Sequence, residues 1–410
     1  MERMVVSLFC YFLFVVLNVS VTAQDWPEFR GPTGQGHSGE YELPFEWSES
    51  RNVLWKIPVP GSGWSTPVAA SGLVWVTVAI NQSGASLRAV AFDIETGRER
   101  VNKEVFSIKA VRAKHPKNSL ASPTPVIDGD RVYVHFGAYG TAALTTSGKI
   151  VWKKRFPYLS QHGNGGSPVI YGDLLIFSCD GDDTAFVIAL DKQTGKVRWK
   201  TPRQRPISQA YSTPLVIRVG NRDEIVSVGA YRAVAYEPES GKEIWSVGYN
   251  DGFSNVPRPV YGRGLVYIAT GFFQPSLLAV RADGVGDVTE THIAWSLQRA
   301  MPLTPSPLLV RDALYVVNDR GIATCVDATT GEILWRKRLG GNYSASPVFG
   351  DGRIYFLNEE GVTTVITPGK EFVPLATNQL DGTTLASMAI ASGSIFLRSD
   401  SHLYRIGVLE

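Results

Sequence analysis

Four short segments of the sequence carry residue types that could do chemistry. Residues 180–183, Asp-Gly-Asp-Asp, have spaced carboxylates like those of calcium-binding loops. Such a group could bind a hard divalent cation, because these cations prefer oxygen ligands. His135 lies in an alternating apolar run and His162 precedes a glycine-rich stretch, and imidazole groups can bind metals or transfer protons. Gly163 and Gly165 have the spacing that begins a dinucleotide-binding turn. Each segment is only a fragment of a functional motif.

A structural role is the simpler interpretation of most of these segments. Residues 180–183 lack the downstream Glu of an EF-hand and join two predicted strands, so we interpret them as a solvated hairpin turn. No helix is predicted after Gly165, which excludes a dinucleotide fingerprint. His135 is expected to be a partly buried strand residue, whereas His162 is open to both a structural role and ligand contact. The sequence has no Gly-x-Ser-x-Gly elbow, so a serine hydrolase is not predicted.

The composition excludes several classes of protein. The chain has 410 residues, of which 44% are hydrophobic, and its net charge is +2, so it can bury a large core and is not a nucleic-acid-binding module. Ten Trp and 16 Tyr residues exclude a disordered chain. Beyond the N-terminal segment only Cys179 and Cys325 remain, each in an apolar run, which predicts two separate buried thiols.

The N-terminus has the pattern of an export signal. Residues 5–17 are apolar except for one Ser, and Val-Thr-Ala at residues 21–23 is a small-residue cleavage pattern. The apolar run is shorter than a membrane span. We therefore predict a cleaved signal peptide at residues 1–23 and no transmembrane segment in the mature chain, with an uncleaved anchor as the alternative.

One phrase recurs along nearly the whole predicted mature chain. It consists of Ser or Thr, then Pro, then Val or Leu, followed by a turn and an alternating apolar run, which predicts two short strands. Its copies are marked by Pro67, Pro125, Pro168, Pro214, Pro259, Pro307 and Pro347, and by Met388 in a degenerate eighth copy. After a longer first interval, the spacing of 40–48 residues is typical of propeller blades.

A second phrase follows the first in most copies, and residues 189–199 are its fullest form. They read as a strand, a tight turn with Gly at a position of positive φ, and an outer strand with Trp four residues past the Gly. A Trp fixed within a repeat is expected to wedge between neighbouring repeats rather than to stack on a cofactor. Six residues hold this structural place: Trp55, Trp152, Trp199, Trp245, Trp295 and Trp335.

The two ends of the chain give the number of blades. The eighth repeat lacks an outer strand, whereas residues 52–56 read as an outer strand without a repeat of their own. We predict an all-β fold, an eight-bladed β-propeller of four-stranded antiparallel blades, with its ring closed by the N-terminal outer strand. The predicted organisation is a signal peptide at 1–23, an N-terminal arm at 24–51 and the propeller at 52–410, in a monomer.

The second phrase resembles the tryptophan-docking repeat, Ala-x-Asp-x-x-Thr-Gly-x-x-x-Trp, of the PQQ-like eight-bladed propellers. The resemblance covers about 350 residues and is specific to the architecture. It implies one of three groups: the quinoprotein alcohol and glucose dehydrogenases, the BamB-type propeller of outer-membrane assembly, which binds partners, or secreted bacterial PQQ-like proteins without assigned activity. Residues 25–34, DWPEFRGPTG, are most similar to the third group.

The loops into the predicted innermost strands argue against the dehydrogenases. That resemblance implies a Ca²⁺ held by Glu, Asn and Asp, with an Asp base beside the quinone. The eight loops contain no carboxylate, because Asp251 and Asp381 belong to the preceding turns, and the vicinal cysteine pair of the methanol-oxidising branch is missing. We therefore predict no catalytic residue, no metal and no cofactor; PQQ and Ca²⁺ are expected only if the chain is a dehydrogenase.

These loops are expected to surround the central channel on one face of the ring, where a ligand can be enclosed on several sides. The predicted ligand-binding residues are Trp64, His162, Asn164, Tyr211, Asn255, Arg258, Asn342 and Tyr343. Arg258 replaces the usual Ser or Thr before the strand proline. Its guanidinium is expected either to hold an anionic ligand, with little role in stability, or to pair with Asp251 or another neighbour.

Residues 98–117 form an enlarged connection with seven basic and two acidic residues. They read either as a solvated loop or as a docking face for an acidic partner. Taken together, the sequence predicts an exported protein, periplasmic or extracellular, that acts as a binding or protein-interaction scaffold in the cell envelope. Its expected partner is an envelope protein or polymer and not a nucleic acid. A PQQ-dependent dehydrogenase of alcohols or sugars is the alternative.

Overall fold

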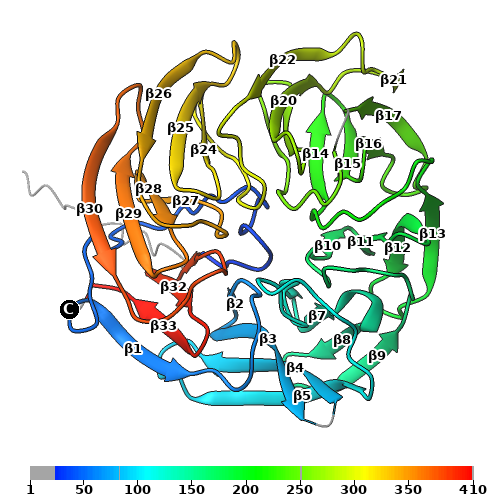
Figure 1. The fold of residues 1–410 in the computed structure, drawn as a ribbon. Helices are drawn as coiled ribbons and strands as arrows, with labels where there is room; N and C mark the ends of the chain where they lie inside the picture. Colours follow the sequence, from blue (N-terminus) through cyan, green and yellow to red (C-terminus); the bar gives the residue numbers. More distant parts are fainter. Residues whose placement is uncertain (1–23, 83, 250–251, 409–410) are drawn as a thin grey trace, which may run out of the picture.

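The computed structural model describes residues 24–82, 84–249 and 252–408, so the predicted signal peptide lies outside the described residues. Eight antiparallel sheets stand around a central channel (Figure 1), which confirms the predicted eight-bladed propeller. Helical structure in these ranges is limited to one 3-10 turn, η1 (Gly137–Tyr139). None of the described helical structure is long and apolar enough to cross a membrane.

The blades are four-stranded meanders whose strands follow each other from the channel outward. Blade 1 contains β2 (Val68–Ala70), β3 (Leu73–Gln82), β4 (Gly84–Asp93) and β5 (Glu99–Ile108), and blade 2 contains β6 (Val126–Asp128), β7 (Arg131–His135), β8 (Thr141–Thr145) and β9 (Ile150–Lys154). Blade 3 contains β10 (Val169–Tyr171), β11 (Leu174–Asp180), β12 (Ala185–Asp191) and β13 (Val197–Pro202), and blade 4 contains β14 (Leu215–Val219), β15 (Arg222–Val228), β16 (Arg232–Tyr236) and β17 (Glu243–Gly248). Blade 5 contains β18 (Val260–Gly262), β19 (Leu265–Thr270), β20 (Ser276–Arg281) and β22 (Ile293–Gln298), and blade 6 contains β23 (Leu308–Val310), β24 (Ala313–Val317), β25 (Ile322–Asp327) and β26 (Ile333–Arg338). Blade 7 contains β27 (Val348–Gly350), β28 (Arg353–Leu357), β29 (Val362–Thr367) and β30 (Val373–Gln379), and blade 8 contains β31 (Ala389–Ala391), β32 (Ser394–Arg398), β33 (His402–Ile406) and β1 (Val53–Pro58). A short extra strand, β21 (Gly286–Asp287), pairs with β17.

The turn between the third and fourth strands forms as its sequence predicts. In blade 3 the carboxylate of Asp191 accepts hydrogen bonds from the backbone N–H of Thr194 at 2.8 Å and from its hydroxyl at 2.7 Å. Gly195 has a φ of +68°, which residues with a Cβ rarely adopt. The turn therefore directs the chain back along the sheet and brings Trp199 to the outer strand β13.

The repeated tryptophans connect each blade to the next. The indole N–H of Trp199 donates to the carbonyl of Pro238 in blade 4 at 2.7 Å, and a Cβ at Gly241 would overlap the indole ring. The same contact to the following blade is made by Trp55 with Ile94, Trp152 with Lys192, Trp295 with Ala328 and Trp335 with Gly369. Trp245 differs, because it donates to Glu224 of its own blade at 2.8 Å.

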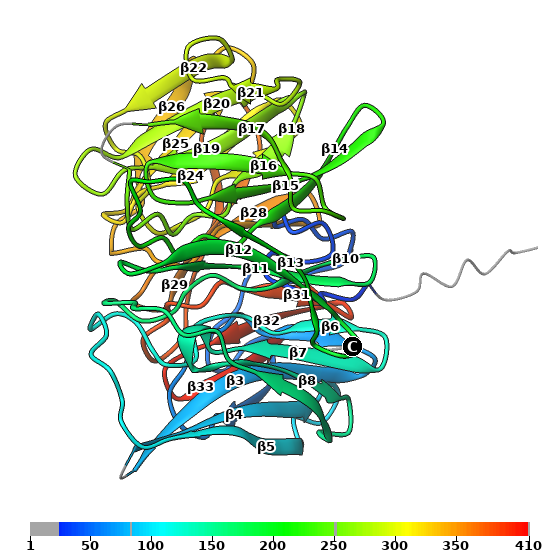
Figure 2. The same ribbon diagram turned by 90° about the vertical axis from the view of Figure 1, so that its right-hand side faces the viewer.

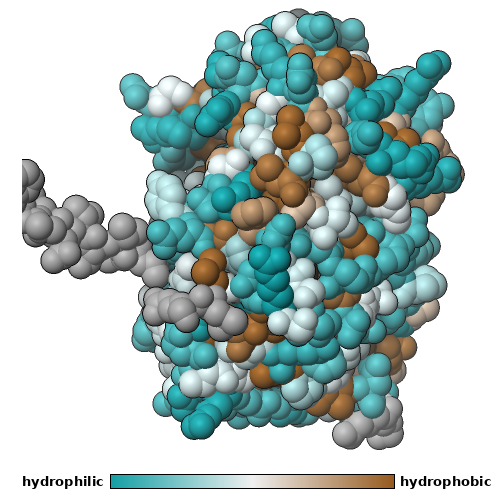
Figure 3. Space-filling model, turned by 90° about the vertical axis from the view of Figure 1, so that its left-hand side faces the viewer, coloured by the Kyte–Doolittle hydropathy of each residue, from teal (hydrophilic) through white to brown (hydrophobic). Residues whose placement is uncertain are grey.

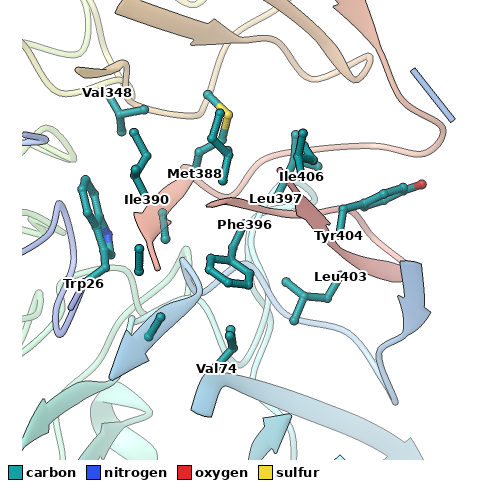
Figure 4. Packing of buried hydrophobic residues seen from close by; sticks show 14 of the residues in the cluster. Trp26, Val74, Val348, Met388, Ile390, Phe396, Leu397, Leu403, Tyr404 and Ile406 are labelled. Atoms are coloured by element: carbon teal, nitrogen blue, oxygen red, sulfur yellow. The ribbon is translucent and has the colours of Figure 1, made fainter. Parts of the chain in front are cut away.

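The N-terminal strand closes the ring as predicted. β1 pairs antiparallel with β33, so the outer strand of blade 8 comes from the opposite end of the chain. Behind this pair, Phe396, Leu403 and Ile406 belong to a buried cluster that also contains Val74 of blade 1 and Val348 of blade 7 (Figure 4). Closure therefore joins three blades into one hydrophobic core.

The N-terminal arm lies across one end of the channel. The backbone of Trp26 exchanges two hydrogen bonds with Ala69 of blade 1, at 2.7 and 2.9 Å. Further along the arm, the N–H of Ser38 donates to Phe349 of blade 7 at 2.8 Å. Figure 2 shows the arm, in blue, on the face of the ring opposite the long loop that follows β5. The arm therefore covers the face away from the loops that lead into the innermost strands.

The Ser and Thr residues before the strand prolines form a belt of hydrogen bonds around the channel. In most blades the backbone N–H at this position donates to the side-chain hydroxyl at the same position of the following blade. The links are Thr66 to Thr124, Thr124 to Ser167, Ser167 to Thr213, Arg258 to Ser306, Ser306 to Ser346 and Ser346 to Ser387, each at 2.9 or 3.0 Å. Thr213 cannot make such a link to blade 5, because Arg258 has no hydroxyl group.

Candidate functional site

A cavity of about 440 Å³ occupies the channel on the loop face. Its wall includes hydroxyl-bearing residues of the hydrogen-bonded belt, such as Thr124 and Ser306. Phe29 of the N-terminal arm also lines it, and aromatic and apolar side chains from the loops, such as Phe272 and Leu303, complete the lining. The cavity therefore combines hydrogen-bonding walls with an apolar surface.

Three of the eight predicted ligand-binding residues line this cavity: Trp64, His162 and Tyr211. The ring centroids of His162 and Tyr211 are 6.0 Å apart, and those of His162 and His115 are 5.7 Å apart. Burial and the neighbouring His115 lower the pKa of His162, and burial raises the pKa of Tyr211 to about 12. At neutral pH the cavity therefore presents these two rings as uncharged, hydrogen-bonding aromatic groups.

Four other predicted residues support the loops outside the cavity lining. Asn164, Asn255 and Tyr343 each lie three residues before the belt position of their blade, and all three are buried. Asn164 donates to the carbonyl of Phe136 at 2.9 Å, and Asn255 donates to that of Gly229 at 2.8 Å. Each amide therefore ties a loop to the end of a neighbouring strand. Asn342 is exposed, and its amide donates to Glu360 at 3.3 Å.

Arg258 lies beneath the arm and not on the cavity surface. Its side chain is 2% exposed, and its guanidinium contacts Glu28 at 3.0 Å, the carbonyl of Pro214 at 3.0 Å and the carbonyl of Phe29. Burial raises the pKa of Glu28, and the charge of Arg258 opposes that rise. Asp251, the partner considered from the sequence, lies outside the described residues. Because removal of Arg258 would leave the partly buried carboxylate of Glu28 without its partner, this placement argues against the expectation of little effect on stability.

Sequence reasoning missed several residues in or next to the cavity lining. Lys117, from the enlarged connection, reaches across to Glu359 of blade 7, with 2.8 Å between the ammonium and the carboxylate. Phe272 and Phe273 follow β19, their ring centroids are 5.2 Å apart, and Phe273 is 68% exposed. The position of the two Phe residues in the sequence could have indicated them, because they lie between the second and third strands of blade 5. Loops at that position open on the same face of a propeller as the loops that lead into the innermost strands.

The residues around the cavity do not fit a quinoprotein metal site. Among the described residues Asp319 is the one carboxylate in the lining, and it already accepts hydrogen bonds from the backbone N–H groups of Leu303 at 2.8 Å and Thr304 at 3.4 Å. Within residues 24–82, 84–249 and 252–408 there is no group of three or more His, Cys, Asp or Glu residues that could hold a metal ion. A Ca²⁺ ion needs several oxygen ligands, so these residues do not provide the site that the dehydrogenase alternative requires.

The structure corrects the interpretation of residues 180–183 and confirms that of the two cysteines. Asp180 is not part of a solvated turn: it is buried and pairs with Arg203, with 2.6 Å between their charged atoms. Asp182 and Asp183 do form an exposed turn. Cys179 and Cys325 are both buried and free, which confirms two separate thiols.

His135 makes stability depend on pH in the acidic range. It is buried, its ring contacts that of Phe177 at 4.6 Å, and burial lowers its pKa from 6.5 to about 3. The unfolded chain therefore takes up a proton below pH 6.5 that the folded chain excludes, so the free energy of unfolding falls as the pH falls.

We expect this single group to cost about 2 kcal/mol of stability between pH 7 and pH 5. In His135→Gln that part of the pH dependence should disappear. Urea unfolding of both proteins at the two pH values measures it. A variant with the parent's full pH dependence would assign the effect to another group.

Comparison with known proteins agrees with the fold and identifies the family. A family model described as outer membrane protein assembly factor BamB matches residues 46–221 and 281–385. A curated protein of that name from Bordetella pertussis is 26% identical over 254 residues, which are 58% of this chain and 59% of that protein. Another, from Alkalilimnicola ehrlichii, is 32% identical over 167 residues, 38% of this chain and 40% of that protein. The chain thus spans less than two thirds of the length of either relative.

Two solved structures share the architecture. BamB from Moraxella catarrhalis has a TM-score of 0.64 at 14% identity and covers 87% of this chain and 97% of its own. A europium-containing methanol dehydrogenase has a TM-score of 0.63 at 10% identity and covers 92% of this chain and 90% of its own. Such low identities show the propeller fold alone. Because the family model matches more than half of the sequence, the chain belongs to the family of PQQ-like propellers described as outer membrane protein assembly factor BamB.

Proposed function

We propose that this protein is a non-catalytic scaffold of the cell envelope that holds a polypeptide segment of a partner protein in its loop-face cavity. The observation that carries the proposal is the shape and chemistry of the cavity, which has the arm at one end and aromatic loops at the other. The relatives named as outer membrane protein assembly factors support an outer-membrane protein as the partner. The signal-peptide pattern of residues 1–23 supports export to the periplasm.

The lining suits an extended peptide with apolar side chains. Trp64, Tyr211 and Phe272 provide aromatic surface, and burial of apolar side chains against it is favourable. Ser and Thr hydroxyl groups of the wall can bond the carbonyl and N–H groups of the peptide, which would otherwise lose their hydrogen bonds to water. These two kinds of contact would hold many sequences, as a scaffold for several clients requires.

A photo-crosslinking amino acid at Phe272 tests this proposal. We expect it to trap an outer-membrane protein in living cells, and the double variant Trp64→Ala/Tyr211→Ala to lower the yield by about tenfold, equivalent to about 1.4 kcal/mol of binding. Mass spectrometry of the crosslinked bands identifies the trapped segment. Val285, which is 76% exposed and far from the cavity lining, is the control position. The same products from both positions, or none at Phe272, would contradict a cavity-bound peptide.

A further inference from the structure

We propose that the outer rim of blades 1 to 3 binds an acidic polysaccharide. This surface, here termed the basic rim, consists of residues 98–103, 149–155 and 196–205. Together these segments contain twelve basic residues and one acidic residue, whereas the whole chain has 40 and 38. Eleven of the twelve basic side chains are exposed; the exception is Arg203. A nearly neutral protein thus concentrates positive charge on three consecutive blades.

The structure makes these segments one continuous surface. They lie on or beside β5, β9 and β13, the outermost strands of adjacent blades, which follow one another along the edge of the ring in Figure 1. Lys153 of β9 donates to the carbonyl of Val105 of β5 at 3.1 Å. Lys153 and Arg155 also lie over the ring of Phe106, at 5.5 and 5.4 Å. These contacts join blades 1 and 2 and hold two of the cations in place.

Much of this charge is not neutralised by the protein. Arg100 pairs with Asp93 at 2.8 Å and Arg198 with Asp191 at 3.5 Å. Among the described residues, no carboxylate forms an ion pair with Lys103, Lys154 or Lys196. An anionic ligand therefore gains attraction here without first displacing an internal partner.

Protection of open strand edges does not explain the basic rim. Lysines on an edge strand discourage pairing with other chains, and this need applies to every blade. However, β22 and β30 contain no Lys or Arg, and Val373 and Leu375 of β30 are 46% and 41% exposed. Figure 3 shows this other side of the ring, where hydrophobic residues are scattered among hydrophilic ones. β26 of blade 6 also carries three basic residues, Arg336 to Arg338, but its neighbours β22 and β30 carry none, so a run of three adjacent basic outer strands occurs only on blades 1 to 3 among the described residues.

The shape of the basic rim favours a linear polymer as its ligand. Three of eight blades form a convex arc, which a flat membrane can touch at only one place. A peptide that adds to a sheet must follow one strand edge, whereas the charge crosses the edges of three separate sheets. A linear polymer with repeated carboxylate or sulfate groups can follow the arc. Its hydroxyl groups can also bond the free backbone groups of the outer strands.

Binding of the full mature chain to immobilised polygalacturonate tests the proposal. The test variant neutralises four exposed cations of the basic rim: Lys103→Gln, Lys149→Gln, Lys154→Gln and Lys196→Gln. The matched control removes the same charge elsewhere: Lys242→Gln, Arg336→Gln, Arg338→Gln and Lys370→Gln. We expect the test variant to bind at least about tenfold more weakly than the parent, and the control at most about twofold.

Further measurements test whether the binding is electrostatic, whether the variants remain folded and which class of ligand is bound. Parent binding should weaken steeply as salt rises from about 50 to 200 mM, and all three proteins should unfold at the same temperature. Equal losses of binding in the two variants would show that binding depends only on the net charge of the protein, and this would overturn the proposal. Equal binding to polyglutamate, or binding to phosphatidylglycerol vesicles without binding to polygalacturonate, would assign the surface to an acidic polypeptide or a membrane instead.

Discussion

Loss of β1 is expected to lower the melting temperature by more than about 10 °C or to cause aggregation. Removal of residues 24–59 leaves the edge of β33 without its partner along the whole pair from Val53–Ile406 to Pro58–His402. It also removes Trp55, whose indole N–H donates to Ile94 of blade 1 at 2.8 Å. The exposed edge is then a template for pairing with other chains. Calorimetry and light scattering measure the two outcomes.

A permuted chain separates the strand from its connection. The N–H of Gly407 donates to the carbonyl of Asn52 at 3.0 Å, so a short turn can join the end of β33 to the start of β1. Residues 52–59 placed after Val408 would then complete blade 8 as a hairpin in a chain that still lacks the arm. We expect this permuted chain to regain most of the lost stability. Equal instability of the two chains would show that β1 is not what closes the ring.

Trp199→Ala is expected to cost about 3–5 kcal/mol, as for other large truncations in a core. Trp199 is 8% exposed, and its N–H bonds Pro238 across the boundary between blades 3 and 4. Trp335→Ala should cost less, because Trp335 is only partly buried. Urea unfolding measures both variants. Equal losses would mean that burial does not set the contribution of these tryptophans.

A double-mutant cycle isolates the contact between Trp199 and the next blade. Gly241→Ala alone should be strongly destabilising, because its φ is +69° and the new Cβ would overlap the indole ring. In the Trp199→Ala background the overlap with the ring is gone, and what remains is the backbone strain of about 1 kcal/mol together with a close approach of the new Cβ to the Thr201 hydroxyl, at 2.8 Å. Additive effects of the two substitutions would show that Gly241 and Trp199 do not act as one unit.

The repeat made the fold predictable, because the strands, the turns and the tryptophans are local patterns that return every 40–48 residues after a longer first interval. Even the closing strand could be found, as residues 52–56 had an outer-strand pattern without a blade. The arm was not predictable in the same way. It has no periodic pattern, and its contacts, such as the bond from the Trp47 N–H to Asn378, join residues 331 positions apart.

The candidate site was predictable only in part for a similar reason. The repeat located the loops around the channel but not the direction of each side chain. Asn164, Asn255 and Tyr343 share one place in the repeat and are all buried, so a hydrogen-bonding residue type in these loops does not ensure contact with the cavity. Asp180 was misread because its partner, Arg203, lies on a different strand, which the composition of the turn does not reveal.

The pairing of the two chain ends also limits how fast the ring can form. Val53 pairs with Ile406, so this contact must close a loop that contains nearly the whole propeller. Contacts of such long sequence separation form slowly, because chain entropy is lost before the contact forms. At about 5–20 residues per second, β1 leaves the ribosome tens of seconds before β33 exists. A chain that carries the last strand at its beginning therefore needs protection from aggregation for all of that time.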